Sequence, residues 1–219
     1  DGGIVDDLIL YRKNNGYLMV VNAANINKDF NWLNNNNMSD VKLENLSAMY
    51  ALIAIQGPKS RGLLNQFTDT DLFMPFYSFI DSKVQGYDVM ISRTGYTGEL
   101  GFEIYGDSDS LVHIWEELIN TGAKPAGLAA RDILRLEMKY CLYGNDIDQS
   151  TNPLEAGLSW ITDLSKENFI GKTALKEIKA KKVKRQLIAF SMNERGIPRK
   201  DYDIFIDSEK VGRVTSGTQ

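Results

Sequence analysis

A glycine-rich stretch at residues 93–103 constrains the fold more than any other part of the sequence. It reads RTGYTGELGFE, and apolar residues alternate on both sides of it, at Val89 and Ile91 and again at Phe102 and Ile104. Two alternating runs around a glycine-rich centre predict an antiparallel hairpin. Glycine tolerates positive φ and lets a ligand approach the backbone closely, so the tip of this hairpin is a candidate binding element. The competing interpretation is a surface hairpin whose polar side chains have no binding role.

The rest of the pattern predicts helices between hairpins rather than regular βαβ repeats, which is typical of the α+β class. Residues 4–11 and 17–22 are expected to form two strands around an Asn14-Asn15-Gly16 turn. Further strands are expected at residues 41–45, 48–56, 73–80, 83–93 and 102–105, and helices after Pro58, from a Ser108 cap, and at residues 128–140. A basic helix at 169–184 precedes strands at 186–192, 203–206 and 210–214.

The composition excludes several classes of protein. A formal net charge of -4 over 219 residues argues against a general nucleic-acid or anionic-membrane binder, which needs a basic surface. No run of eighteen apolar residues occurs, so no transmembrane helix is expected. Cys141 is the single cysteine, which rules out an internal disulfide and suits a reducing compartment.

Most familiar catalytic motifs are absent from the sequence. Gly171-Lys172-Thr173 imitates a phosphate-binding loop, but Lys166 stands where that loop needs a glycine. The single histidine, His113, falls in a predicted helix, where a surface position is the commoner role, and no histidine–cysteine cluster could hold zinc. An enzyme left with carboxylates, tyrosines and arginines would work by positioning a reactive cofactor.

Two adjacent carboxylates, Asp6 and Asp7, lie inside the first expected strand. Successive strand residues point to opposite faces, so one of the two should face inward or line a cavity. Aspartate is disfavoured in strands, which makes the pair notable. A solvated edge strand is the other reading of the same residues.

Six segments, taken in order, resemble the T protein family of the glycine cleavage system, the tetrahydrofolate-dependent aminomethyltransferases. They are residues 2–7 (GGIVDD), 20–25 (VVNAAN), 56–58 (QGP), 92–103 (SRTGYTGELGFE), 125–132 (PAGLAARD) and 152–158 (NPLEAGL). The resemblance runs over nearly all of the chain. On this resemblance we expect the chain to be a fragment, because the family's upstream segment and most of its terminal barrel lie outside the sequence.

The resemblance implies a multi-lobed α+β folate-binding fold with the start of a C-terminal β barrel. Residues 1–46 would be the remainder of one folate-binding lobe, a hairpin plus a helix. Residues 47–182 would form an α+β folate-binding lobe, and residues 183–219 the beginning of the barrel domain.

The family's reaction moves a one-carbon unit. The lipoylated H protein presents an aminomethyl group, tetrahydrofolate takes the methylene carbon, and ammonia leaves. The resemblance therefore implies the H protein and tetrahydrofolate as partners, with no metal, nucleic acid or membrane. The expected location is the bacterial cytoplasm, or the mitochondrial matrix if the source is a eukaryote.

The resemblance also assigns roles to individual residues. It implies that Asp7 is the catalytic carboxylate, that Glu103 pairs with the pterin, and that Arg131 faces the carboxylate of the glutamate tail. Asn22 and Tyr96 would line the same folate pocket.

Three other kinds of protein fit some of the same sequence segments. The folate-binding portion of a sarcosine or dimethylglycine dehydrogenase carries a similar domain behind a flavin domain. A non-catalytic iron–sulfur-assembly relative places a cysteine near residues 168–172, where this chain has none. A folate-binding module without turnover is the third alternative.

Overall fold

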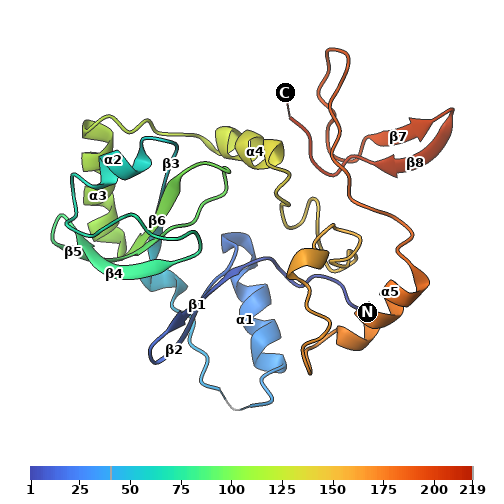
Figure 1. The fold of residues 1–219 in the computed structure, drawn as a ribbon, viewed down its shortest axis with the longest axis horizontal. Helices are drawn as coiled ribbons and strands as arrows, with labels where there is room; N and C mark the ends of the chain where they lie inside the picture. The colour runs from blue at the N-terminus through green and yellow to red at the C-terminus, as the bar shows by residue number, and fades with distance from the viewer. Residues whose placement is uncertain (40, 219) are drawn as a thin grey trace. The chain divides into compact units, whose positions relative to one another are not determined.

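The computed structural model describes residues 1–39 and 41–218, which form two compact units (Figure 1). One unit combines Asp1–Leu33 with Lys139–Gln219, and the other is Asn34–Met138. The first unit is therefore discontinuous in sequence, and its two segments bring distant residues together. Among the described residues, no helix has the length and apolar character needed to cross a membrane.

The Asn34–Met138 unit is built on a four-stranded antiparallel sheet with the strand order β3-β6-β5-β4. The strands are Ala51–Gln56 (β3), Phe79–Val84 (β4), Tyr87–Ser92 (β5) and Gly101–Gly106 (β6). The predicted hairpin is confirmed, because β5 and β6 pair with Met90 opposite Tyr105 and Ser92 opposite Glu103. The glycine-rich residues between these strands form its tip.

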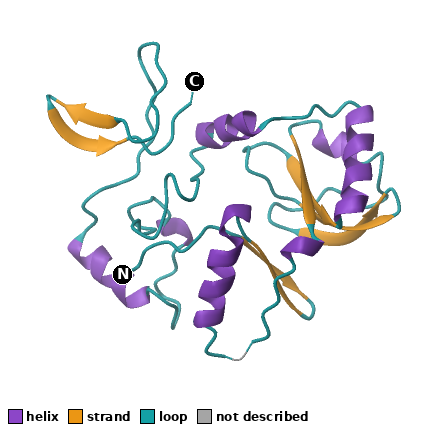
Figure 2. Ribbon diagram, turned by 180° about the vertical axis from the view of Figure 1, so that it is seen from behind, coloured by secondary structure: helices purple, strands orange, loops and turns teal. Residues whose placement is uncertain are grey.

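Helices pack beside this sheet and close its core (Figures 1 and 2). Helix α2 (Ser60–Leu64) contacts β6, and α3 (Ser108–Asn120) contacts β3 and β6. The alternation of apolar residues along each strand places one face in this core. The buried members are Ile53, Ile55, Leu64, Leu72, Val84, Val89, Ile91, Phe102, Ile104, Leu111, Ile114 and Leu118.

The expected cap of α3 is corrected by one residue. Asp107, not Ser108, precedes the helix, and its Oδ1 accepts the Ser110 N–H at 2.9 Å. Aspartate at this position satisfies a free N–H of the first turn. Helix α4 (Leu128–Glu137) follows and completes the unit.

The other unit begins with the predicted hairpin of β1 (Ile9–Lys13) and β2 (Gly16–Val20). Its first strand starts at Ile9 rather than at residue 4, because the backbone before it bonds elsewhere. The Ile4 N–H, for example, donates to the carbonyl oxygens of Asp148 and Thr151. A 3₁₀ helix, Ala23–Asn25, and helix α1 (Ile26–Asn35) follow β2.

The later elements of this unit are α5 (Lys172–Lys181), β7 (Asp203–Ile206), β8 (Glu209–Arg213) and a 3₁₀ helix at Ser159–Ile161. The expected strands at 203–206 and 210–214 are thus confirmed as a hairpin. The strand expected at 186–192 is wrong, because the Leu187 N–H bonds to Glu155 O instead of to a neighbouring strand. The strand expected at 41–45 is also wrong, since the Asn37 side chain bonds both N–H and C=O of Val41.

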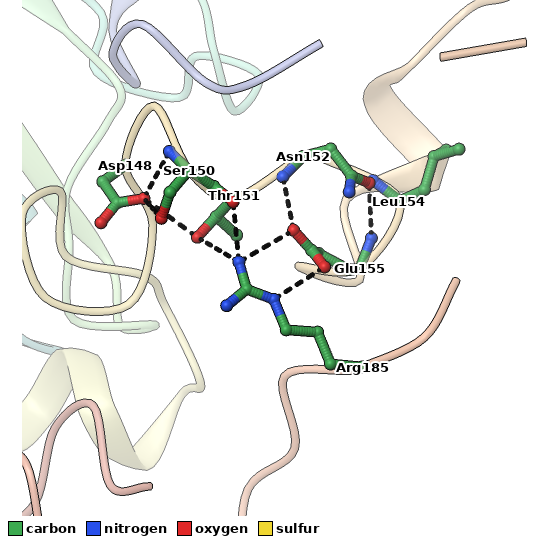
Figure 3. A network of polar contacts seen from close by, with 7 residues as sticks. All are labelled: Asp148, Ser150, Thr151, Asn152, Leu154, Glu155 and Arg185. Atoms are coloured by element: carbon green, nitrogen blue, oxygen red, sulfur yellow. Dashed lines mark hydrogen bonds and ion pairs between the residues drawn. The ribbon is translucent and has the colours of Figure 1, made fainter. Parts of the chain in front are cut away.

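A polar network ties the segment at 148–155 to Arg185 (Figure 3). Asn152 Oδ1 accepts the N–H of Glu155 at 3.0 Å, and Glu155 Oε1 accepts the N–H of Asn152 at 2.8 Å. This reciprocal pairing has the pattern of a capping box, here closing the turn at residues 153–157 instead of a helix. The same carboxylate binds Arg185 Nε at 2.9 Å, so one buried glutamate fixes both its own turn and the chain that follows α5.

These antiparallel sheets, with helices placed between their hairpins along the chain, confirm the α+β class. The three-part division of the chain and the barrel start at 183–219 stay predictions.

Candidate active site

The two adjacent carboxylates point in different directions. Asp6 and Asp7 lie in the irregular segment just before β1, and not within a strand as expected. The Asp6 side chain is only 1% exposed, whereas Asp7 is exposed to solvent. The expectation that one of the pair faces inward is therefore correct, although the cause is side-chain hydrogen bonding and not strand alternation.

Amide side chains from the segment after β2 hold both carboxylates. Asn22 Nδ2 donates to Asp6 Oδ1 at 2.9 Å and to Asp7 Oδ1 at 3.1 Å. Asn25 Nδ2 donates to Asp6 Oδ2 at 2.8 Å. Asn22 stands at the N-cap of the 3₁₀ helix without capping it, because its amide is turned to the carboxylates. The structure thus brings Asp7 and Asn22 together, while the folate pocket that the resemblance implies for them stays a prediction.

A lysine and a third carboxylate complete this group, which we call the Asp6 cluster: Asp6, Asp7, Asn22, Asn25, Lys28 and Asp29. Lys28 Nζ lies 3.8 Å from Asp6 Oδ2 and 3.3 Å from Asp29 Oδ1. It also donates to Val5 O and lies 3.7 Å from the centre of the Tyr143 ring. The lysine therefore balances part of the negative charge that the cluster holds away from water.

The cluster separates the pKa values of its three carboxyl groups. Burial acts to raise the pKa of Asp6, but the neighbouring Asp29 side chain and hydrogen bonds from Asn22, Asn25 and the Asp7 N–H bring it below its usual value. Burial, followed by the neighbouring Asp6, raises the pKa of Asp29 to about 6. Asp29 is 4% exposed, and among the described residues neither of its carboxylate oxygens accepts a well-formed hydrogen bond.

The pKa of Asp7 is raised by burial, and the negative charge of Asp6 adds to this effect, while the hydrogen bond from Asn22 opposes it. Water still reaches Asp7, which screens these interactions. The Asp7 carboxylate is therefore accessible to a ligand.

In the other unit, Gln56 holds the tip of the β5–β6 hairpin. Its Nε2 donates to the carbonyl oxygens of Thr94 and Phe102, both at 3.2 Å, and its Oε1 accepts from Thr97 Oγ1 at 3.2 Å. A Cβ added at Gly95 or Gly101 would lie 2.0 Å from Gln56 Oε1. A side chain at either position would displace the Gln56 amide group and break its hydrogen bonds to the hairpin tip.

Glu103 lies on β6 with one oxygen already engaged. Its Oε2 accepts from Thr94 Oγ1 at 2.5 Å and from Tyr105 Oη at 2.9 Å. Within residues 1–39 and 41–218, the other oxygen, Oε1, has no hydrogen-bond donor. The half-buried carboxylate is thus held in place with one acceptor free for a ligand.

Tyr96 and Arg131 are brought together within the same unit. The Arg131 guanidinium carbon lies 4.4 Å from the centre of the Tyr96 ring, a cation–π contact between the hairpin tip and α4. Arg93 instead supports the hairpin, since its Nη1 donates to Gly101 O at 3.0 Å. Tyr96, Glu103 and Arg131 belong to one unit, and Asp7 and Asn22 belong to the other.

Sequence reasoning missed several members of these groups. Asn25 and Gln56 lie in segments that the resemblance had marked, but spacing alone does not show where an amide points. Lys28 and Asp29 have no motif of their own, and only their proximity in α1 to residues 22–25 could have drawn attention to them. In the described part of the chain, no group of three or more histidine, cysteine, aspartate or glutamate side chains is placed to hold a metal ion.

Comparison with known proteins adds independent findings. A family profile described as the GCVT N-terminal domain matches residues 1–166. The chain is 49% identical over 224 residues to an aminomethyltransferase of Halothermothrix orenii, with 100% of this chain and 63% of that protein covered. It is 51% identical over 226 residues to an aminomethyltransferase of Flavobacterium psychrophilum, with 100% of this chain and 62% of that protein covered.

The crystal structure of glycine cleavage system aminomethyltransferase T from Bartonella henselae has a similar fold. It matches with a TM-score of 0.89 and 32% sequence identity over 99% of this chain and 61% of that chain. This similarity confirms the predicted fold class. The chain spans less than two thirds of the length of these relatives.

Proposed function

The chain belongs to the family of the GCVT N-terminal domain, and on that premise we propose that it carries out aminomethyl transfer in the glycine cleavage system. The reaction moves a methylene group from the aminomethyl-dihydrolipoyl arm of the H protein to tetrahydrofolate and releases ammonia. The names of the curated relatives and the accessible, fixed carboxylate of Asp7 support this proposal.

Asp7 is the proposed catalytic residue. As a folate nitrogen attacks the electrophilic methylene carbon, it gains positive charge and sheds a proton. A carboxylate held beside that nitrogen stabilises the developing charge and can accept the proton. Asn22 donates to one oxygen of Asp7 at 3.1 Å, and within the described part of the chain the other oxygen accepts no hydrogen bond and can face the substrate.

Glu103 is the proposed pterin partner, with its free Oε1 as the acceptor for the exocyclic amino group. Because Oε2 already accepts two hydrogen bonds, the adjacent ring N–H has to share or displace one of these donors. Arg131 is proposed to bind the carboxylate of the glutamate tail, to which its planar guanidinium group is well matched. Tyr96 would give the pocket an apolar face beside that arginine.

The proposed role of Glu103 can be tested by calorimetric titration of the full-length protein with tetrahydrofolate. Glu103→Gln is expected to weaken binding by about 10- to 100-fold, the loss of a charged hydrogen-bond acceptor worth about 1.5–3 kcal/mol. Glu99 is an exposed glutamate in the same hairpin tip, so Glu99→Gln is the matched control. This variant should bind tetrahydrofolate with the affinity of the parent protein. Equal affinity of both variants would remove Glu103 from the site.

The proposed macromolecular partner is the lipoylated H protein. Helix α5 and the residues after it carry Lys176, Lys179, Lys182 and Lys184, none of which has an ion pair among the described residues. Such a group of lysines attracts an acidic partner over a long range. We propose that this basic surface steers the H protein.

Reversing Lys176, Lys179 and Lys184 to glutamate is expected to lower the association rate by about tenfold or more at low salt. The same change at Lys59, Lys83 and Lys124, exposed lysines of the other unit, gives a control with an equal change in net charge. Stopped-flow association at several salt concentrations measures the difference. A rate that is unaffected by the first set, or equally affected by both, contradicts the proposal.

The curated relatives described above come from bacteria, which supports a bacterial cytoplasmic location as the proposed one.

A further inference from the structure

Asp6 is a buried carboxylate without an assigned role. Its side chain is 1% exposed, which is costly for a charged group unless hydrogen bonds or counter-charges replace its water. Here Asn22, Asn25, the Asp7 N–H and Lys28 all face it. An apolar residue would fill the same space without that cost, so the presence of a fully satisfied carboxylate calls for an explanation.

The contacts of Asp6 converge on Asp7. Asp6 Oδ1 accepts the backbone N–H of Asp7 at 2.9 Å, which fixes the Asp7 main chain. The same oxygen accepts from Asn22 Nδ2 at 2.9 Å, and that amide also donates to Asp7 Oδ1 and Asp7 O, both at 3.1 Å. Among the residues that the structure describes, Asp6 therefore holds the one side chain that hydrogen-bonds to the Asp7 carboxylate.

Asn25 and Lys28 hold the opposite side of Asp6. Asn25 Nδ2 donates to Oδ2 at 2.8 Å, and Lys28 Nζ lies 3.8 Å from the same oxygen. Both oxygens of Asp6 are thus engaged, and the carboxylate cannot rotate without breaking contacts on two sides. A reacting group supported by such a locked neighbour keeps its geometry through the reaction.

We propose that Asp6 is a positioning residue for the Asp7 carboxylate during aminomethyl transfer, an inference that rests on the proposed function. Asp6 does not touch the substrate. It fixes the backbone of Asp7 directly and its side chain through Asn22.

Asp6→Asn tests this role, because it keeps the size of the side chain and removes the charge. Single-turnover transfer from aminomethylated H protein is expected to slow by about 10- to 100-fold, the effect of a small misplacement of a reacting group. Tetrahydrofolate affinity, measured by calorimetry, should change less than about threefold, since binding depends on other residues. A structural role alone would not separate rate from affinity in this way.

The titration of Asp7 gives a readout that does not need activity. Because the charge of Asp6 raises the pKa of Asp7, Asp6→Asn should lower that pKa in an NMR titration of the carboxyl carbon. Asp148→Asn is the matched control in the same unit, since this carboxylate also accepts three hydrogen bonds, from Ser150 N, Ser150 Oγ and Thr151 Oγ. It should lose stability without changing the rate or the pKa of Asp7.

The outcomes separate this inference from the proposed function. A parent protein that neither binds tetrahydrofolate nor transfers the methylene group overturns the proposed function. An active parent with a folded Asp6→Asn variant of full rate and unchanged Asp7 pKa overturns the positioning role. If Asp6→Asn does not fold, Asn25→Ala serves instead, because it removes one hydrogen bond from Asp6. This variant should show a smaller loss of the transfer rate and keep its affinity for tetrahydrofolate. A full transfer rate in Asn25→Ala counts against the proposal.

Discussion

Replacing Asp7 with asparagine is expected to slow methylene transfer to tetrahydrofolate by about 10²- to 10⁴-fold, the range for loss of a general acid–base group. The fold should keep its stability, because asparagine retains the Oδ1 that accepts from Asn22 at 3.1 Å. Only the charge is lost, and with it the stabilisation of the cationic folate nitrogen. Single-turnover assays with aminomethylated H protein measure the rate, and thermal unfolding measures the stability.

Asp88→Asn is the control for this experiment. Asp88 lies on β5 with a side chain that is 88% exposed and paired with Lys83, so its loss should affect neither rate nor stability appreciably. Full transfer activity in the Asp7 variant would exclude Asp7 as the catalytic carboxylate. A loss of activity that follows unfolding would instead show that Asp7 acts on the fold.

Two of the hairpins could be predicted because their signals are local, whereas the strands expected at 73–80 and 83–93 are wrong in their bounds, since β4 and β5 meet at a turn between Val84 and Tyr87. The alternation at Val89, Ile91, Phe102 and Ile104 fixes which side chains enter the core, and the glycines between them locate the tip. The Asn14-Asn15-Gly16 turn likewise set the pairing of β1 with β2. In both cases the residues that define the hairpin are close together in the sequence.

The contacts that shape the candidate site could not be predicted, because they join side chains to backbone groups across long separations. Asn22 and Asn25 reach back sixteen and nineteen residues to Asp6, and Gln56 reaches forward to Thr94 and Phe102. An amide in a sequence does not reveal its partner. The expected start of β1 is wrong for a similar reason, since the Ile4 N–H bonds to the distant carbonyl oxygens of Asp148 and Thr151 and not to a neighbouring strand.

The resemblance implied that Asp7, Asn22, Tyr96, Glu103 and Arg131 are site residues, which stays a prediction, and the structure places two pairs among them in contact. Asn22 orients Asp7, and Arg131 packs on Tyr96. What the resemblance could not supply is the difference between the adjacent carboxylates Asp6 and Asp7. Burial separates them, with one held as a fixed support and the other open to solvent.

Asp29→Asn is expected to stabilise the protein at neutral pH by about 1–3 kcal/mol in the free energy of unfolding. The folded state raises the pKa of Asp29 from 3.8 to about 6, so between these values the folded protein binds the proton more tightly than the unfolded chain does. Stability contributed by this group is therefore lost as the pH rises from about 4 to about 6 and stays lost above it. Asparagine imitates the protonated carboxyl group and avoids that loss.

Urea unfolding at pH 7.5 and pH 5 measures the effect, which should be clearly smaller at pH 5, where Asp29 is still largely protonated in the folded protein. Lys28 and Asp6 are the charged groups that face this carboxyl group. The loss of the ion pair with Lys28 at 3.3 Å keeps the gain in the free energy of unfolding below its upper limit.

Asp109→Asn is the control, because Asp109 is an exposed aspartate in the first turn of α3, as Asp29 is an aspartate in the first turn of α1. It should lose a few tenths of a kcal/mol, about equally at both pH values. A destabilised Asp29 variant at pH 7.5 would mean that the ion pair with Lys28 outweighs the cost of burying the second carboxylate beside Asp6.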